Sequence, residues 1–165
     1  MAKLLEIDGL RVAFRTEDGL VRAVDDVSFD VEAGETVAVV GESGSGKSVT
    51  ARAVLGLVPR PPGVVEGGAI RFKGEDLLTL DPERLRNLRG ARISMVFQEP
   101  MTALNPLLSI GTQLTEGMRA HLGYDRTRAE RRAAELLDMV GIAEPEQRLK
   151  QYPHQFSGGM RQRVV

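Results

Sequence analysis

The 165-residue sequence contains no cysteine and no tryptophan, and aromatic residues make up only 4% of it. The lack of cysteine excludes disulfides and thiolate metal sites within these residues. No apolar run approaches the roughly 20 residues that cross a bilayer, and Glu6 interrupts the N-terminus too early for a signal peptide. Basic residues number 22 and acidic residues 23, so no general attraction to nucleic acid is expected. We expect a cytosolic globular protein.

A pattern typical of phosphate-binding loops, G-x-x-x-x-G-K-[ST], runs from Gly41 to Ser48. Apolar, mostly β-branched residues at 36–40 precede it, as in a buried parallel strand, and residues 49–58 have helical spacing. Strand, loop and helix thus follow in the order that a phosphate loop requires. A surface turn rich in glycine and serine is one alternative. A dinucleotide-binding loop is another, but it would need glycine or alanine where Val49 stands.

The residue types of this loop suit a nucleoside triphosphate. Its glycines let consecutive N–H groups converge on one anion at the positive end of a helix. Lys47 supplies a charge for the β- and γ-phosphates, and the Ser48 hydroxyl is placed to ligate Mg²⁺. We therefore expect ATP and Mg²⁺ to be held by Gly41, Glu42, Ser43, Gly44, Ser45, Gly46, Lys47 and Ser48.

The remaining pattern mixes strands and helices. Short strands are expected at 4–7, 11–15, 21–24 and 27–31, with a hairpin turn at Asp18 and Gly19, and further strands at 67–72 and 93–97. Asp81 is expected to cap a helix that runs toward Arg89. Thr127 and Glu130 form a predicted capping box for a helix that ends before Gly141. This order indicates an α/β fold.

Two further segments point to a family. Gln98 directly follows the expected strand 93–97, and residues 156–163 read Phe-Ser-Gly-Gly-Met-Arg-Gln-Arg. Together with the phosphate loop, these segments resemble the ATP-binding cassette of ABC transporters over essentially the whole chain. Residues 60–92 and 97–106 look most like the subfamily that powers import of oligopeptides, dipeptides and nickel.

This resemblance implies a P-loop NTPase cassette with an N-terminal antiparallel β layer, an incomplete parallel core sheet and a helical subdomain. Residues 1–98 would form the β layer and the P-loop core, and 99–165 the helical subdomain ending in the signature motif. Two ATP-binding subunits would pair head to tail, on the cytoplasmic face of the membrane, beside integral membrane permease subunits. No nucleic-acid partner is implied. One class of alternative is a cassette protein without a pore, acting in DNA repair or on ribosomes; another is a nucleotide-binding regulator that does not hydrolyse.

The resemblance also assigns roles to single residues. ATP would lie between the phosphate loop of one subunit and Ser157, Gly158 and Gly159 of the other, although Ser157 alone is also a plain helix cap. The Gln98 amide would contact Mg²⁺ and the attacking water, unless it is only a polar cap at a strand end. Phe14 would stack on adenine or serve as an ordinary core residue.

The chain departs from the family pattern in the second half of the nucleotide site. In complete cassettes the helix after Ser157 leads to an apolar strand ending in a Mg²⁺-binding Asp, then a Glu general base and a switch His. These are not among the 165 residues. We therefore expect this chain alone not to turn over ATP at a useful rate, and the missing strand to leave an apolar sheet edge open beside 36–40. Met160 stands where many cassettes carry Gln.

Overall fold

The computed structural model describes residues 3–97 and 103–165. The chain divides into two compact units, Met1–Ile93 and Ser94–Val165, which are taken in turn below. Gln98, one of the predicted site residues, lies outside the described residues.

The first unit is built on an antiparallel sheet with the strand order β2-β1-β3-β4. β1 (Lys3–Thr16) and β2 (Gly19–Glu32) form a long hairpin, and β3 (Gly63–Phe72) and the short β4 (Glu75–Asp76) follow on the other side of β1. Four short strands were expected in residues 4–31, but there are two long ones. Register shifts absorb the irregular positions without ending the ladder. The predicted antiparallel β layer is present.

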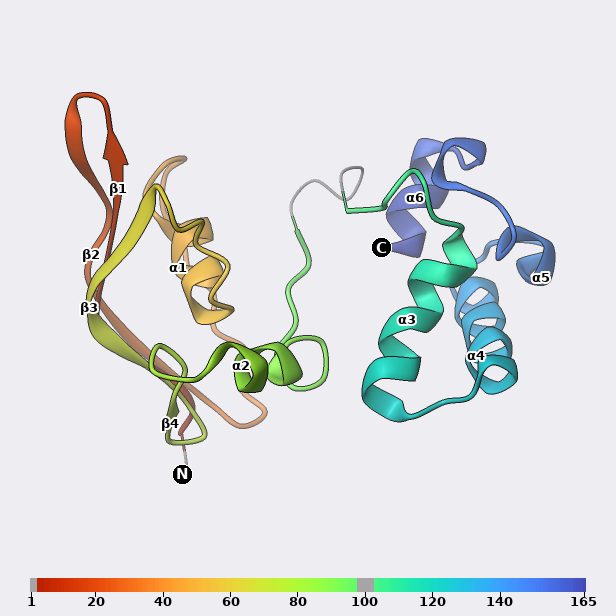
Figure 1. Cartoon of the computed structure of the whole chain (residues 1–165), viewed down its shortest axis with the longest axis horizontal. Coiled ribbons are helices and arrows are strands. Elements are labelled where there is room, and N and C mark those ends of the chain that lie inside the picture. The colour runs from red at the N-terminus through yellow and green to blue at the C-terminus, as the bar shows by residue number, and fades with distance from the viewer. Residues whose placement is uncertain (1–2, 98–102) are drawn as a thin grey trace. The chain divides into compact units, whose positions relative to one another are not determined.

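One helix closes the core of this unit. α1 (Lys47–Val54) lies against the sheet (Figure 1), and its Ala53 and Val54 are buried with sheet residues Ile7, Leu10, Val12, Val24 and Ile70. α2 (Pro82–Leu88) follows β4, and its N-cap is Asp81, as predicted. The Asp81 carboxylate accepts hydrogen bonds from the backbone N–H groups of Glu83 (3.1 Å) and Arg84 (2.9 Å).

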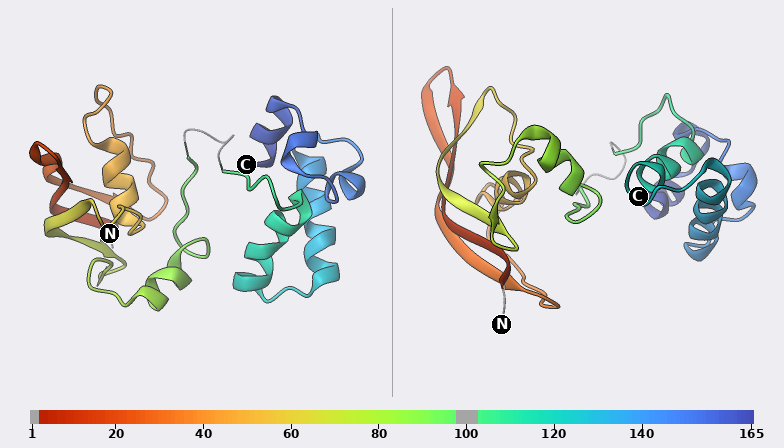
Figure 2. Two further views of the ribbon diagram at one scale, coloured as in Figure 1. Left: turned by 45° about the horizontal axis from the view of Figure 1, so that its top comes forward. Right: turned by 60° about the horizontal axis from the view of Figure 1, so that its bottom comes forward.

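The second unit is helical and has a core of its own. α3 (Ile110–Leu122) and α4 (Arg126–Met139) lie side by side (Figure 2), and α5 (Pro145–Arg148), the 3₁₀ turn η2 (Pro153–Gln155) and α6 (Gly158–Val164) follow. The buried core consists of Ile110, Leu137, Ile142 and Phe156. No helix in the described part of the chain is long and apolar enough to cross a membrane.

The start of α4 differs from the prediction. The N-cap is Asp125, whose carboxylate accepts a hydrogen bond from the backbone N–H of Arg128 at 2.8 Å. The capping box expected at Thr127 and Glu130 is therefore wrong, and Thr127 lies in the first turn of the helix. Asp125 caps the free N–H groups two residues earlier, and aspartate is an equally favourable cap.

Two expected core strands are also not formed. Residues 36–40 are irregular and exposed, with Val40 89% accessible, and residues 93–97 form only an isolated bridge between Ile93 and Arg89. A strand needs hydrogen-bonded neighbours, and a parallel strand with apolar residues on both faces needs cover on each side. Within 3–97 and 103–165 no strand pairs with residues 36–40. Their apolar side chains therefore stay exposed.

Candidate functional site

The predicted phosphate loop connects residues 36–40 to α1, and its last glycine packs closely on the sheet. Gly44 and Gly46 have φ values of +83° and +90°, which favour glycine. A Cβ atom on Gly46 would lie 2.3 Å from the carbonyl oxygen of Ala23 in β2. Glycine at 46 therefore lets the loop rest directly on the sheet, and this contact sets where α1 begins.

The loop wraps around the ammonium group of Lys47. Its Nζ donates hydrogen bonds to the carbonyl oxygens of Gly41 (2.7 Å) and Glu42 (2.7 Å), and to Oγ of Ser45 at 3.2 Å. The backbone N–H of Ser45 donates to the carbonyl oxygen of Glu42, which closes a turn inside the loop. The cationic end of Lys47 is thus centred in the loop, although the loop residues 41–45 are exposed to solvent.

The first turn of α1 is open to a ligand. Gly46 is its N-cap and provides no side-chain cap, so the N–H groups of the first turn keep their capacity to bind an anion. The Ser48 side chain is exposed and, among the described residues, has no hydrogen-bond partner. A hydroxyl oxygen is the type of ligand that Mg²⁺ prefers, so Ser48 fits the metal role predicted for it.

Phe14 lies on the strand next to the one that supports the loop. It pairs with Val21 of β2, two residues from Ala23, and with Gly63 of β3. Its side chain is half-buried and packs against the core of the first unit. The structure thus gives Phe14 a packing role, and its contact with adenine stays a prediction.

The predicted signature segment opens α6 in the second unit. Ser157 is the N-cap, and its Oγ accepts a hydrogen bond from the backbone N–H of Met160 at 3.3 Å. Phe156 is 3% exposed and anchors the segment in the core. Gly158 and Gly159 are exposed, neither has a positive φ, and a Cβ atom on either would meet no described atom within 4 Å. Neither packing nor backbone conformation in this unit requires glycine at these two positions.

Two arginine contacts were missed by sequence reasoning. Nη1 of Arg163 in α6 donates to the carbonyl oxygens of Val140 (3.1 Å) and Gly141 (2.6 Å) at the end of α4. Arg89 makes a similar pair of bonds at the end of α1. A glycine after a helix does indicate helical carbonyls without partners. Which of the chain's arginines supplies the donors depends on tertiary packing.

The structure therefore assembles part of the predicted site. The loop 41–48 contacts β2 at Gly46, and Phe14 lies on the neighbouring strand. Ser157, Gly158 and Gly159 belong to the other unit. Gln98 is not among the described residues.

Comparison with known proteins gives a consistent result. A family model described as ABC transporter matches residues 24–165. The oligopeptide transport ATP-binding protein OppD of Bacillus subtilis is 50% identical over 165 residues, covering 100% of this chain and 46% of that protein. The dipeptide transport ATP-binding protein DppD of the same organism is 52% identical over 165 residues, covering 49% of that protein. The chain spans about half the length of the curated relatives it matches.

A solved structure confirms the fold class. The ATP-binding cassette MJ0796, in a dimeric post-hydrolysis state bound to ADP and Pi, matches with a TM-score of 0.80 and 25% identity. The match covers 97% of this chain and 66% of that one. The predicted α/β cassette fold is therefore confirmed, although residues 36–40 and 93–97 are not paired as strands.

Proposed function

The chain belongs to the ABC transporter family, and on that basis we propose that it forms the ATP-binding part of an importer's ATPase subunit. The observation that carries the proposal is the loop around Lys47, in which three acceptors hold the ammonium group at the start of an uncapped helix. This arrangement combines a cation in the loop with free N–H groups in the first turn of the helix that the loop opens, as binding of a triphosphate requires.

The metal role rests on a small set of oxygen ligands. Ser48 would hold Mg²⁺ through its exposed hydroxyl, and Gln98 would contribute its amide oxygen. When bound, Mg²⁺ would neutralise charge on the phosphates. The chain's own contribution is to keep the Ser48 hydroxyl in the first turn of α1, on the residue that follows Lys47.

The partner of the site is proposed to be a second ATP-binding subunit, arranged head to tail. Gly158 and Gly159 support this proposal because glycine is a poorer helix former than alanine, by at most about 1 kcal/mol at these first helical positions, while nothing in the second unit requires them. A close approach by the phosphates of a partner's nucleotide would explain both glycines. Integral membrane permease subunits would complete an assembly at the cytoplasmic face of the membrane.

The cargo is proposed from the relatives. OppD and DppD are named as oligopeptide and dipeptide transport proteins, so we propose peptides as the transported class, with nickel as the other member of the predicted subfamily. The names of these relatives favour an importer over a cassette protein without a pore. Phe14 is proposed to lie against the adenine ring.

The first experiment compares MgATP binding to the wild-type chain and to Lys47→Ala by titration calorimetry. Removing a charged group that donates to the phosphates is expected to cost roughly 1.5 to 3 kcal/mol of binding free energy. Lys150→Ala is the matched control, because Lys150 is an exposed lysine outside the loop, and its affinity should equal that of the wild type. Equal affinities for all three proteins would remove Lys47 from the phosphate site.

The same proteins test whether these 165 residues hydrolyse ATP. We expect binding without steady phosphate release, because the residues that would orient the attacking water and complete the metal site are not all present. Phosphate release is measured with a coupled colorimetric assay. Steady release that Lys47→Ala abolishes would show that residues 1–165 suffice for catalysis.

A further inference from the structure

The C-terminal end of α1, the helix that follows the phosphate loop, is held by specific hydrogen bonds. After α1, Gly56 has a φ of +60°, its N–H donates to the carbonyl oxygen of Ala53 (2.9 Å), and the N–H of Leu57 donates to that of Arg52 (2.8 Å). This pair of bonds is a Schellman motif. The motif ends the helix. The carbonyl oxygens of Leu55 and Gly56 then have no helical N–H to accept from, and they need other donors.

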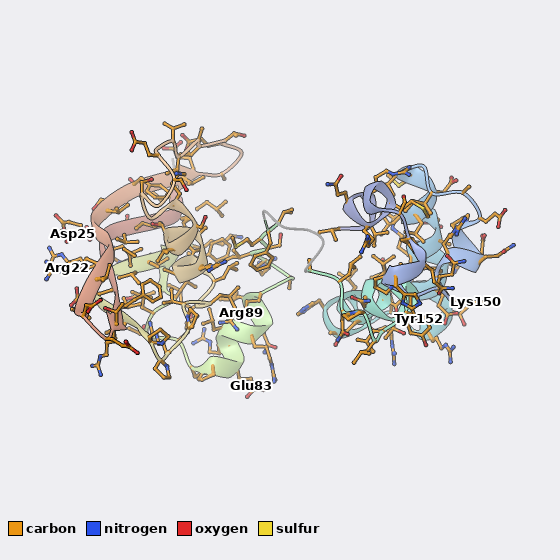
Figure 3. The ribbon with its side chains drawn as sticks, turned by 90° about the horizontal axis from the view of Figure 1, so that it is seen from above. Arg22, Asp25, Glu83, Arg89, Lys150 and Tyr152 are labelled. Carbon is orange, nitrogen blue, oxygen red and sulfur yellow. The ribbon has the colours of Figure 1, made fainter. Side chains whose placement is uncertain are left out.

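Those donors come from Arg89, the residue that follows α2 (Figure 3). Its Nε donates to the Leu55 carbonyl oxygen at 2.6 Å and its Nη2 to the Gly56 carbonyl oxygen at 3.1 Å. A Cβ atom on Gly56 would lie 2.6 Å from Cδ2 of Leu85 and 3.0 Å from Nη2 of Arg89. The end of α1 is therefore packed directly on α2, and a positive charge lies at the negative end of its dipole.

The helix is thus held at both ends over a short span. At its start, Gly46 rests on the carbonyl oxygen of Ala23. Nine residues later, at Leu55, the Arg89 fork begins to hold the carbonyls that follow the helix, about 14 Å away at 1.5 Å per residue. A helix this short has little room to bend, so a shift at one end moves the other, where Lys47 and Ser48 lie.

We propose that Arg89 is a positioning residue for nucleotide binding, acting through α1 on the Lys47 ammonium and the Ser48 hydroxyl. This inference rests on the proposed function of the loop. The planar fork of arginine suits the role because it donates to two carbonyl oxygens at once, whereas a lysine ammonium is a flexible point charge. Arg89 also forms the bridge with Ile93, so the segment that leads toward Gln98 starts from the same residue.

The test is a double-mutant cycle in the 165-residue chain, with MgATP affinity measured by titration calorimetry. We expect Arg89→Ala to weaken affinity about five- to ten-fold and Arg89→Lys about two- to three-fold. Arg86→Ala is the matched control. Arg86 is an exposed arginine on the same helix, with no side-chain hydrogen bond or ion pair to any described residue, and its loss should change affinity less than two-fold.

The Lys47→Ala background separates positioning from general stability. If Arg89 acts by placing Lys47, Arg89→Ala should change affinity less in that background than in the wild type, because part of the group it positions is gone. An equal loss in both backgrounds, or no loss in either, would overturn the inference. Should Arg89→Ala lack native circular dichroism, Arg89→Lys carries the same cycle with the same two outcomes.

Failure of the proposed function would look different. In that case the wild-type chain would show no binding of MgATP that Lys47→Ala removes. Binding that needs Lys47 but ignores Arg89 would overturn the positioning role alone.

Discussion

At the scale of single residues, Lys47 and Ser48 are expected to contact a nucleotide in two different ways. Lys47 is tied to the loop by its own hydrogen bonds, whereas the Ser48 hydroxyl, the next residue in the chain, is exposed. Lys47 is therefore expected to act on the phosphates whether or not a metal is present. Ser48 is expected to act through the metal.

Ser48→Ala tests this distinction. Loss of one oxygen ligand is expected to weaken MgATP binding by about 1 kcal/mol, roughly five-fold, similar to a lost hydrogen bond. Binding of ATP in EDTA should stay unchanged, as measured by the same calorimetric titration with and without metal. Ser94→Ala, at an exposed serine outside the loop, serves as the control. A loss of equal size in EDTA would contradict the metal role.

At the scale of elements, α6 carries glycines at its first two positions for no reason visible within its own unit. We expect Gly158→Ala to raise the free energy of unfolding by about 0.5 to 1 kcal/mol, because alanine is the better helix former. Urea unfolding followed by circular dichroism measures this change.

A buried glycine provides the matched control. At Gly111 in α3 a Cβ atom would lie 2.7 Å from the carbonyl oxygen of Leu149, so Gly111→Ala should destabilise the chain. If Gly158→Ala were as damaging, the fold of this unit would itself require glycine there, and the argument for a partner's nucleotide would fail.

Features that depend on contacts between residues close in sequence were predicted better than features that depend on distant contacts. The caps at Asp81 and Ser157 involve atoms three residues apart or fewer. The cap at Asp81 was predicted correctly, and at Ser157 the structure shows the helix cap that was the alternative to a nucleotide contact, which stays a prediction. The cap of α4 was misplaced because Asp125 and Thr127 are both good caps and only one can begin the helix. The phosphate-loop pattern predicted a nucleotide contact for residues 41–48, which stays a prediction, but it did not predict that Gly41, Glu42 and Ser45 accept hydrogen bonds from Lys47. The Arg89 contact, 34 positions away from Leu55, has no local signature.

The segments 36–40 and 93–97 were predicted as strands but are not strands in the structure. Their apolar composition indicated buried strands, because it is typical of strands that have neighbours on both sides. Whether such a segment becomes a strand depends on hydrogen-bond partners elsewhere in the chain. The described residues provide none for 36–40, so composition alone did not determine the structure.

At the scale of the whole molecule, residues 3–97 and 103–165 form two hydrophobic cores that share no residue. One joins α1 to the sheet, and the other contains Leu137 of α4 with three further buried side chains from the helical unit. Cores without shared residues allow the units to open independently.

Leu137→Ala tests this independence. Leu137 is 1% exposed, so its truncation is expected to cost about 2 to 5 kcal/mol. Hydrogen exchange should show lost protection in α3 and α4 but unchanged protection of the β1 amides. Met139→Ala, in the same helix with the side chain 73% exposed, should leave both units unchanged. Loss of protection in β1 with Leu137→Ala would show that the chain unfolds as one unit.

The ring of acceptors around Lys47 also bears on how fast a nucleotide can bind. Because the loop is already closed on its own ammonium group, an arriving triphosphate exchanges one set of partners for another instead of ordering a disordered loop. We expect such an encounter to need no folding of the loop, so that the observed rate rises linearly with nucleotide concentration in a stopped-flow measurement.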